Sequence, residues 1–394
     1  MPALDPVGAR LLDQAGWTGP DPDALPTGAD LLEHYLEPLA ALPALAGRIH
    51  LHTTVVAVAR HQLDKVRSPG RDRLPFLVRV RDPDGRLRDL QARAVIDASG
   101  TWAQPNPLGA SGLPALGETD ASAQIAYGLP DILGRDHGRY AGRRTVVAGA
   151  GHSAATSLLA LAELQPQAPG TEIVWVVRSA TPRPLVGKGS ADADELPARG
   201  RLATNLAALV DAGRIQVVGG FRIHAVEPAS DRVRLVGDQL LDDDLPEAQR
   251  RQVETDQVIA AAGFRPDHSI AAELRLALEP ALESAAALGP LIDPNVHTCG
   301  TVPAHGIAEL AHPEAGYVIV GMKSYGRAPT FLLATGYQQV RSAVAALAGD
   351  PAGASRCDPG PPAAALCASN RDLLARAGRR PGSRRGWRLV PPWP

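Results

Sequence analysis

The chain has 394 residues, which is enough for two domains of ordinary size. Its 40 basic and 42 acidic residues leave a formal net charge of −2, so the chain lacks the basic footprint of a nucleic-acid-binding or membrane-surface protein. Its three cysteines are far apart and include no C-x-x-C pair, which disfavours both a disulfide framework and a dithiol redox centre.

The sequence has no apolar run near the roughly 20 residues that span a bilayer, and its first residues do not resemble a signal peptide. We therefore expect a cytoplasmic protein that acts on a small-molecule substrate, with no nucleic-acid or membrane partner. The sequence leaves the oligomeric state open.

The first hundred residues predict helices followed by a small antiparallel meander. Residues 5–15 and 28–42 have helical patterns, and the second of these is clearly amphipathic. Three strands are expected at residues 48–60, 75–80 and 87–92, the last two flanking a Pro- and Gly-bearing turn.

A short apolar strand at residues 94–98 runs into Ser99, Gly100 and Thr101. Small residues at a strand end let the backbone approach a ligand closely, so these three are candidates for cofactor contact. The next segment, up to Gly142, is rich in Gly, Pro and Asp and is expected to be a connection between domains.

Residues 144–178 predict a strand, a helix and a second strand. The first strand ends in a G-x-G-x-x-A loop, formed by Gly149, Ala150, Gly151, His152, Ser153 and Ala154. In this motif Gly149 permits the tight turn, Gly151 lets backbone N–H groups approach a diphosphate, and Ala154 lets the helix pack closely on its strand. The start of the helix then faces the phosphates.

Arg178 follows the second strand, at the position where an acidic residue would hold the ribose 2′-hydroxyl of NAD. A guanidinium there favours NADPH over NADH. The polar loop that follows carries Arg183, Lys188 and Arg199, either as ordinary surface residues or as further contacts to the phosphate of NADPH, and Arg199 is our candidate among them.

The second half of the chain predicts a helix at residues 202–211 and strands at 214–218, 224–227, 232–236 and 257–261. A further strand is expected at 317–320, followed by a glycine-bearing turn. Pro329 is predicted to open a helix that continues to Leu347. Residues 351–394 are rich in Pro, Ala and Arg and predict a poorly ordered tail.

Histidine and cysteine residues gather late in the chain. They are His297, Cys299, His305 and His312. Their spacing fits no standard zinc pattern, so we predict no metal site. Cys299 is instead a candidate for a reactive or substrate-facing residue.

Four segments together resemble the two-dinucleotide-domain flavoproteins, and more closely their flavin-containing monooxygenase-like branch. The segments are residues 97–101, 149–154, 261–266 and 321–326. The resemblance covers residues 28–350 and implies an α/β fold. In this fold a Rossmann-like NADPH domain, residues 143–266, is inserted into an FAD-binding domain made of residues 1–142 and 267–350, which includes the meander. It also implies flavin contacts from Gly321, Lys323 and Ser324.

The sequence departs from that family at two points. The G-x-G-x-x-G loop that holds the FAD diphosphate does not precede Ala94, so either the sequence starts downstream of the family's first unit or the chain is a relative without that unit. In addition, the family's Gly-Asp pair is Gly321-Met322 here, and Lys323 and Tyr325 are candidates to compensate.

The resemblance implies transfer of a hydride from NADPH to FAD and of an oxygen atom to a soft nucleophile. Asn106 and either Ser324 or Tyr325 are the expected neighbours of the isoalloxazine ring, and Cys299 with His297 would suit a thiophilic substrate. Two alternatives remain: a non-catalytic NADPH-binding remnant, and a flavin-dependent reductase that passes electrons to a partner protein.

Overall fold

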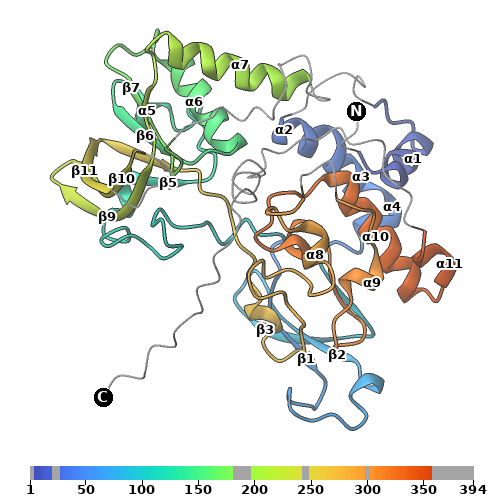
Figure 1. The fold of residues 1–394 in the computed structure, drawn as a ribbon. Coiled ribbons are helices and arrows are strands. Elements are labelled where there is room, and N and C mark those ends of the chain that lie inside the picture. The colour runs from blue at the N-terminus through green and yellow to red at the C-terminus, as the bar shows by residue number, and fades with distance from the viewer. Residues whose placement is uncertain (1–3, 20–26, 181–196, 242–247, 298–301, 357–394) are drawn as a thin grey trace, which may run out of the picture.

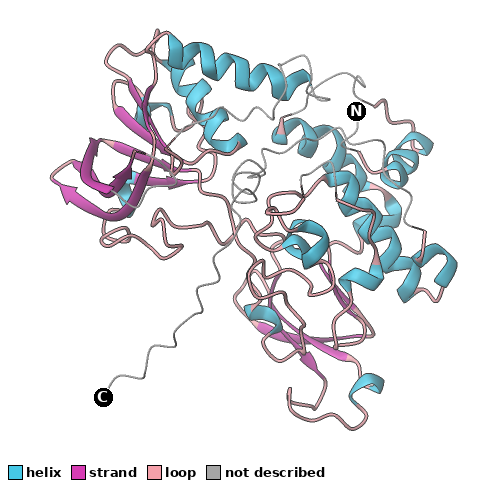
Figure 2. Ribbon diagram, viewed as in Figure 1, coloured by secondary structure: helices cyan, strands magenta, loops and turns pink. Residues whose placement is uncertain are grey.

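The computed structural model describes residues 4–19, 27–180, 197–241, 248–297 and 302–356, with the backbone alone at 197–201 (Figure 1). The described chain forms two bodies of helices and strands that are joined near the centre of the molecule (Figure 2). One body contains a five-stranded parallel sheet, and the other contains a two-stranded parallel sheet and an antiparallel meander. The predicted α/β class is confirmed.

The five-stranded sheet has the order β5-β12-β6-β7-β8, and all its neighbouring strands are parallel. Its strands are β5 (Ile125–Tyr127), β6 (Arg144–Ala148), β7 (Glu172–Val176), β8 (Gln216–Val218) and β12 (Gln257–Ala260). Three helices accompany it: α5 (His137–Tyr140), α6 (His152–Leu164) and α7 (Pro197–Asp211). Because side chains alternate along a strand, Val147 and Trp175 pack toward α6, whereas Val146 and Val174 pack on the opposite face.

That opposite face is covered by an antiparallel sheet of order β11-β10-β9 (Figure 1). Its strands are β9 (Phe221–Ala229), β10 (Arg232–Leu240) and β11 (Ala248–Thr255). Phe221, Ile223 and Leu235 are buried against the parallel sheet. Both faces of the parallel sheet are therefore covered, as parallel sheets require.

The second body is built around β4 (Val95–Asp97) and β13 (Tyr317–Ile319), which pair in parallel. On one side, Val318 and Val320 pack against α8 (Gly289–Ile292), α9 (Ile307–Leu310) and α10 (Leu333–Leu347). On the other side, Tyr317 and Ile319 pack against the meander of β1 (Thr54–Arg60), β2 (Phe76–Arg81) and β3 (Leu87–Ala92). The predicted meander is confirmed, although its first strand begins at Thr54 instead of residue 48.

The second body also contains short helices, of which α11 packs against α10. They are α1 (Pro6–Gln14), α2 (Gly28–Leu31), α3 (Glu37–Ala41), α4 (Pro43–Ala46) and α11 (Pro351–Ala354). The helical segment predicted at 28–42 is confirmed, and it contains a π-helical turn, Leu32–Leu36, between α2 and α3. Pro38 has no N–H to donate to the carbonyl of His34, and the indole N–H of Trp17 binds that carbonyl instead, at 2.9 Å.

Three other elements differ from the sequence-based expectation. Strand β5 lies in the stretch that was expected to be a connection between domains. Because β5 belongs to the five-stranded sheet, that sheet already begins at Ile125. Strand β11 was not expected. Helix α10 begins at Leu333 and not at Pro329, because Leu332 is extended (φ −125°, ψ 144°) and the preceding Phe331 packs edge-on against Tyr325.

Candidate functional site

The glycine loop lies between the carboxyl end of β6 and the start of α6, as the motif predicts. Gly149 has a φ of +140°, and a Cβ atom placed there would lie 2.3 Å from the carbonyl oxygen of Ala261. Gly149 also donates its N–H to Val176 at 3.1 Å and accepts the indole N–H of Trp175 at 2.7 Å. The end of β6 is thus fixed between β12 and β7, and only glycine fits this position.

Gly151 and the helix after it form an opening suited to a phosphate. A Cβ atom at Gly151 would meet no heavy atom within 4 Å, and Gly151 is the N-cap of α6 with no side-chain cap. The first N–H groups of a 13-residue helix therefore point toward an open space without a capping side chain. Ala154 is fully buried between helix and sheet. This donor set fits the diphosphate of a dinucleotide.

Arg178 lies two residues beyond β7, and its side chain is exposed. Because β6 and β7 are adjacent and parallel, their carboxyl ends lie at the same edge of the sheet, so Arg178 is on the side of the glycine loop. His152 and Ser153 form the first turn of α6 and are half-buried. Arg199 is in α7, but its side chain is outside the described residues.

A second cluster of polar groups lies at the carboxyl ends of β4 and β13. The carboxylate of Asp97 accepts from the ammonium of Lys323 at 2.7 Å, from the hydroxyl of Tyr317 at 2.8 Å, and from the N–H and hydroxyl of Ser99 at 3.0 and 2.7 Å. Lys323 also donates to the hydroxyl oxygen of Ser99 at 3.0 Å. The structure thus brings together Ser99 and Lys323, two of the predicted flavin contacts.

The ion pair at the centre of this cluster is buried: the side chains of Lys323 and Asp97 are 2% and 3% exposed. Burial alone would raise the pKa of Asp97, but hydrogen bonds from Lys323 and Ser99 and the ammonium charge together hold this pKa below its ordinary value. Hydrogen bonds from Ser269, and to a lesser degree the charge of Lys323, lower the pKa of the nearby Asp267. Asp97 is therefore ionised at neutral pH.

Buried amide and imidazole groups hold the turn that follows β13. The side-chain oxygen of Gln339 accepts the N–H of Gly321 at 2.8 Å, and its NH₂ group donates to Ser324 at 2.9 Å and to Nε2 of His305 at 3.0 Å. Nδ1 of His305 lies 3.0 Å from the carbonyl of Pro303, which places the proton on Nδ1. Burial lowers the pKa of His305, which keeps the ring neutral.

Tyr325 and Asn106 both contact other residues of the protein. Tyr325 is fully buried, and its ring packs on Phe331 and His305, with centroids 5.2 and 5.6 Å apart. The amide of Asn106 donates to the carbonyl of Ala262 at 3.0 Å and accepts from Arg265 at 3.0 Å. These contacts fix the turn after β13 and the interdomain connection, and the catalytic roles predicted for the two residues stay predictions.

Asn106 lies in one of two chain segments that connect the two bodies, and Gly263 lies in the other. Its N–H donates to Gly263 at 2.9 Å, and the N–H of Arg265 donates to Gln104 at 2.8 Å, so the segments pair in opposite directions. The rings of Trp102 and Phe264 stack beside this pairing, with centroids 4.8 Å apart and planes inclined by 21°. The crossing lies between the carboxyl ends of β4 and of β12.

The backbone beside the cluster at β4 and β13 is open at two glycines. Gly100 and Gly321 have φ of +69° and +71°, and a Cβ atom at either would meet no heavy atom within 4 Å. Open backbone beside hydrogen-bonding side chains fits the ring end of a flavin. The described residues contain no second strand, G-x-G-x-x-G loop and helix, so they offer no matching cradle for the FAD diphosphate.

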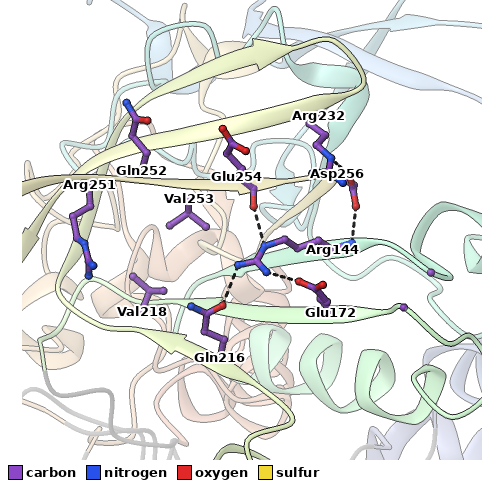
Figure 3. Close-up of a pocket in the computed structure, with 12 residues that line it drawn as sticks. Arg144, Glu172, Gln216, Val218, Arg232, Arg251, Gln252, Val253, Glu254 and Asp256 are labelled. Carbon is purple, nitrogen blue, oxygen red and sulfur yellow. Dashed lines mark hydrogen bonds and ion pairs between the residues drawn. The ribbon is translucent and has the colours of Figure 1, made fainter.

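A separate cavity of about 500 Å³ lies at the opposite, amino-terminal end of the five-stranded sheet (Figure 3). Arg144 crosses it and donates to Gln216 and to the carbonyl of Glu254, both at 3.0 Å, and pairs with Glu172. Its guanidinium is therefore satisfied by protein groups. Ligands of open parallel sheets bind at the carboxyl ends, so this cavity is distinct from the candidate site.

Cys299, the third residue with a predicted catalytic role, lies outside the described residues. His297, His305 and His312 contact the carbonyl of Pro290, the carbonyl of Pro303 and the N–H of Ala277, respectively. Within the described ranges, three or more metal-ligating side chains do not gather anywhere, and none of the helices has the length and apolar character needed to cross a membrane.

Sequence reasoning did not single out Asp97, Tyr317 or Gln339. A carboxylate at the end of an apolar strand was the one available signal for Asp97. Its partner Lys323 lies 226 residues later in the chain, so no local spacing indicates the pair. Gln339 lies in α10, and the apolar pattern of that helix predicts packing against the core but gives no sign of a polar role.

Neither the models of known protein families nor the sequences of curated proteins match this chain. Its fold is nevertheless similar to solved structures. Bacillithiol disulfide reductase Bdr (YpdA) from Bacillus cereus matches with a TM-score of 0.55 and 17% identity, over 81% of this chain and 77% of that one.

Two monooxygenases also match. DfoA bound to FAD, the cadaverine monooxygenase of desferrioxamine biosynthesis from Erwinia amylovora, has a TM-score of 0.51 and 14% identity, over 80% of this chain and 73% of its own. The ornithine N-hydroxylase KtzI from Kutzneria sp. 744 has a TM-score of 0.50 and 16% identity, over 83% and 77%. At these identities the likeness establishes architecture, and the chain has the fold of the two-dinucleotide-domain flavoproteins.

Proposed function

We propose that this chain is an FAD- and NADPH-dependent oxidoreductase of the monooxygenase-like type. The observation that carries the proposal is the uncapped start of α6 beside Gly149 and Gly151, at the carboxyl edge of a parallel sheet. A second carboxyl edge, with open glycines beside the Asp97–Lys323 pair, supports a second cofactor. Solved structures of the same fold include proteins with FAD bound.

Each group has a definite part in this proposal. The backbone N–H groups after Gly151 hold the diphosphate of NADPH, and Arg178 pairs with its 2′-phosphate. Ser99, Gly100 and Lys323 lie against the flavin ring. Together the cofactors supply a hydride transfer from NADPH to FAD and a reduced flavin that can react with oxygen or with another acceptor. The protein's own contribution is binding and orientation.

The first test is the visible absorption spectrum of the purified chain after incubation with FAD and removal of the excess. The proposal expects a retained flavin spectrum that bleaches anaerobically on addition of NADPH. As a matched control, Gly151→Glu places a carboxylate in the open space before α6, so flavin should be retained while NADPH no longer bleaches it. Absence of flavin with intact NADPH binding would instead indicate a non-catalytic NADPH-binding remnant.

The oxygenase part needs a separate measurement. The chain with bound FAD should consume oxygen when NADPH and a sulfur or nitrogen nucleophile are present, and the nucleophile should gain one oxygen atom from ¹⁸O₂. Rapid NADPH oxidation by an artificial acceptor, with no oxygen incorporated into any nucleophile, would identify a reductase that serves a partner protein.

A further inference from the structure

Trp102 is a large aromatic side chain that the fold holds in place and leaves open to solvent. One face of its indole stacks on the ring of Phe264, with centroids 4.8 Å apart and planes inclined by 21°. Trp102 nevertheless keeps 70% of its surface exposed. Because a stacked ring with this exposure is not covered on both sides, the second face of the indole is open. An open indole face is suited to stacking on another flat ring.

The end of β5 fixes the position of both rings. Gly128 directly follows β5 with a φ of +86°, and a Cβ atom there would lie 3.3 Å from Cζ of Phe264 and 3.9 Å from Cη2 of Trp102. The N–H of Gly128 donates to the carbonyl of Ala260, the last residue of β12, at 3.3 Å. The stack therefore lies at the carboxyl ends of β5 and β12. Both strands run parallel with β6, so this is the edge of the sheet that carries the glycine loop.

The strand order places the stack on one side of the glycine loop and Arg178 on the other. In the order β5-β12-β6-β7-β8, the loop follows β6, Arg178 follows β7, and the rings lie at the ends of β12 and β5. Adjacent strands are about 4.8 Å apart, so the stack is one to two strand spacings from the loop. The backbone between them is accessible, because Ala262 and Gly263, which follow β12, are exposed.

This arrangement gives a direction to a bound dinucleotide. If its diphosphate lies at the start of α6 and its adenosine 2′-phosphate meets Arg178, its other half extends along the carboxyl edge toward β12. That half ends in the nicotinamide, which is a flat ring. The open face of Trp102 lies on the side of the loop toward which this ring extends.

We propose that the open face of Trp102 stacks on the nicotinamide ring of the bound dinucleotide and fixes where that ring lies. The inference rests on the proposed function, because it takes the dinucleotide site at α6 as given. The oxidised nicotinamide ring is a cation, and indole is the aromatic side chain that attracts cations best, so NADP⁺ should also bind through this stack. Stacking on one face leaves the other face of the nicotinamide ring free for hydride transfer.

The experiment compares two ligands that differ in the nicotinamide half. NADP⁺ and adenosine 2′,5′-bisphosphate, which lacks that half, are titrated by calorimetry into the purified chain and into Trp102→Ala. Loss of an aromatic stacking partner weakens the binding of a base by about fivefold or more, so we expect a loss of that size for NADP⁺ and an unchanged affinity for the bisphosphate. Unchanged binding of the bisphosphate also shows that the variant is folded.

Two further variants separate stacking from other causes. Trp102→Phe keeps a flat ring and should retain most of the affinity for NADP⁺. Leu116→Ala is the matched control, because Leu116 is 75% exposed in the same connecting segment but its N–H binds His224 of β9, away from the stack. It should bind both ligands as the unmodified chain does.

Tryptophan fluorescence gives a second readout that a change in stability does not imitate. A nicotinamide ring stacked on an indole quenches its emission. The chain has five tryptophans, so the contribution of Trp102 is the difference between the unmodified chain and Trp102→Phe. We expect NADP⁺ to quench the unmodified chain more than Trp102→Phe, and more than the bisphosphate does.

A loss of affinity for NADP⁺ alone, restored by phenylalanine, supports the inference. Unchanged NADP⁺ affinity in Trp102→Ala overturns it and leaves the proposed function standing. An equal loss for both ligands also overturns it, because Trp102 would then act on the adenosine half or on the fold of the domain. An unmodified chain that binds neither ligand overturns both the inference and the proposed function.

Discussion

Trp102 and Phe264 stack with ring centroids 4.8 Å apart at the point where the chain passes between its two bodies. The two residues belong to different crossings, one leaving the β4 edge and the other returning from β12. The bonds between Asn106 and Gly263 and between Arg265 and Gln104 run alongside. The stack therefore joins the two connections, although Trp102 is 70% exposed.

The first prediction concerns this stack. Trp102→Ala and Phe264→Ala should each lower the free energy of unfolding, and the double variant should lose less than the sum of the two. Aromatic pairs contribute about 0.5 to 1.5 kcal/mol beyond their buried area, so we expect a coupling energy of that size. Urea unfolding of the four proteins measures it. Leu113→Ala, at a residue 67% exposed, should couple to neither; strict additivity of Trp102 and Phe264 would contradict the prediction.

The two glycines of the loop should respond differently to alanine. Gly149→Ala places a methyl group 2.3 Å from the carbonyl of Ala261 at a φ of +140°, so the ends of β6 and β12 must separate and the protein should be destabilised by several kcal/mol. Gly151→Ala meets no neighbour, so its urea midpoint should be unchanged while its affinity for NADPH falls. Equal loss of stability in both variants would show that the loop is held in another way.

The local pattern predicted the β6–loop–α6–β7 unit well because each part of it has a local cause. The β-branched run forms the strand, Gly149 fits a backbone that only glycine adopts, and the leucines and alanines of α6 bury a wide face. The turn and the alternating strands likewise predicted the meander.

Other elements depend on partners that are distant in the sequence. Strand β5 has only three residues and forms because Ile125 and its neighbours pair with β12, more than 130 residues later. Within residues 28–42 the π-helical turn Leu32–Leu36 interrupts the regular α-helical spacing; Leu32 and Leu36 are 51% and 44% exposed, and Tyr35 alone is buried. The acceptors that bind Lys323 and Gly321 come from Asp97 and Gln339, which are distant in the sequence, so local spacing could not indicate them.

Arg178 should determine the choice between NADPH and NADH. If its guanidinium binds the 2′-phosphate, Arg178→Ala loses a charge-assisted hydrogen bond, with an expected cost of about 1.5 to 3 kcal/mol in NADPH affinity. Affinity for NADH, which has no 2′-phosphate, should change little. Titration of both nucleotides into the variant tests this. An equal loss for both would mean that Arg178 supports the loop and does not read the phosphate.

Glu314 should make the second body sensitive to acid. Its carboxylate is 1% exposed and binds Arg60 at 2.6 Å and Arg71 at 2.8 Å, which ties the meander to the segment before β13. Burial alone would raise the pKa of Glu314, but the hydrogen bonds from Arg71 and Arg60 outweigh burial and hold its pKa below its ordinary value. A lowered pKa in the folded state means that this stabilisation is fully present above the unfolded pKa, about 4.3, and is lost as pH falls through the folded value.

Glu314→Gln should therefore cost about 3 to 5 kcal/mol at neutral pH, because two arginines are left buried without their counter-charge. The loss should shrink as the pH falls below about 4, where the unmodified protein also loses the charge. Urea midpoints measured from pH 7 to pH 3 test both statements. Asp89→Asn is the control, since the exposed pair of Asp89 with Arg79 should contribute at most about 1 kcal/mol. A difference between Glu314→Gln and the unmodified protein that stays constant across this range would mean that the carboxylate acts through its shape and not through its charge.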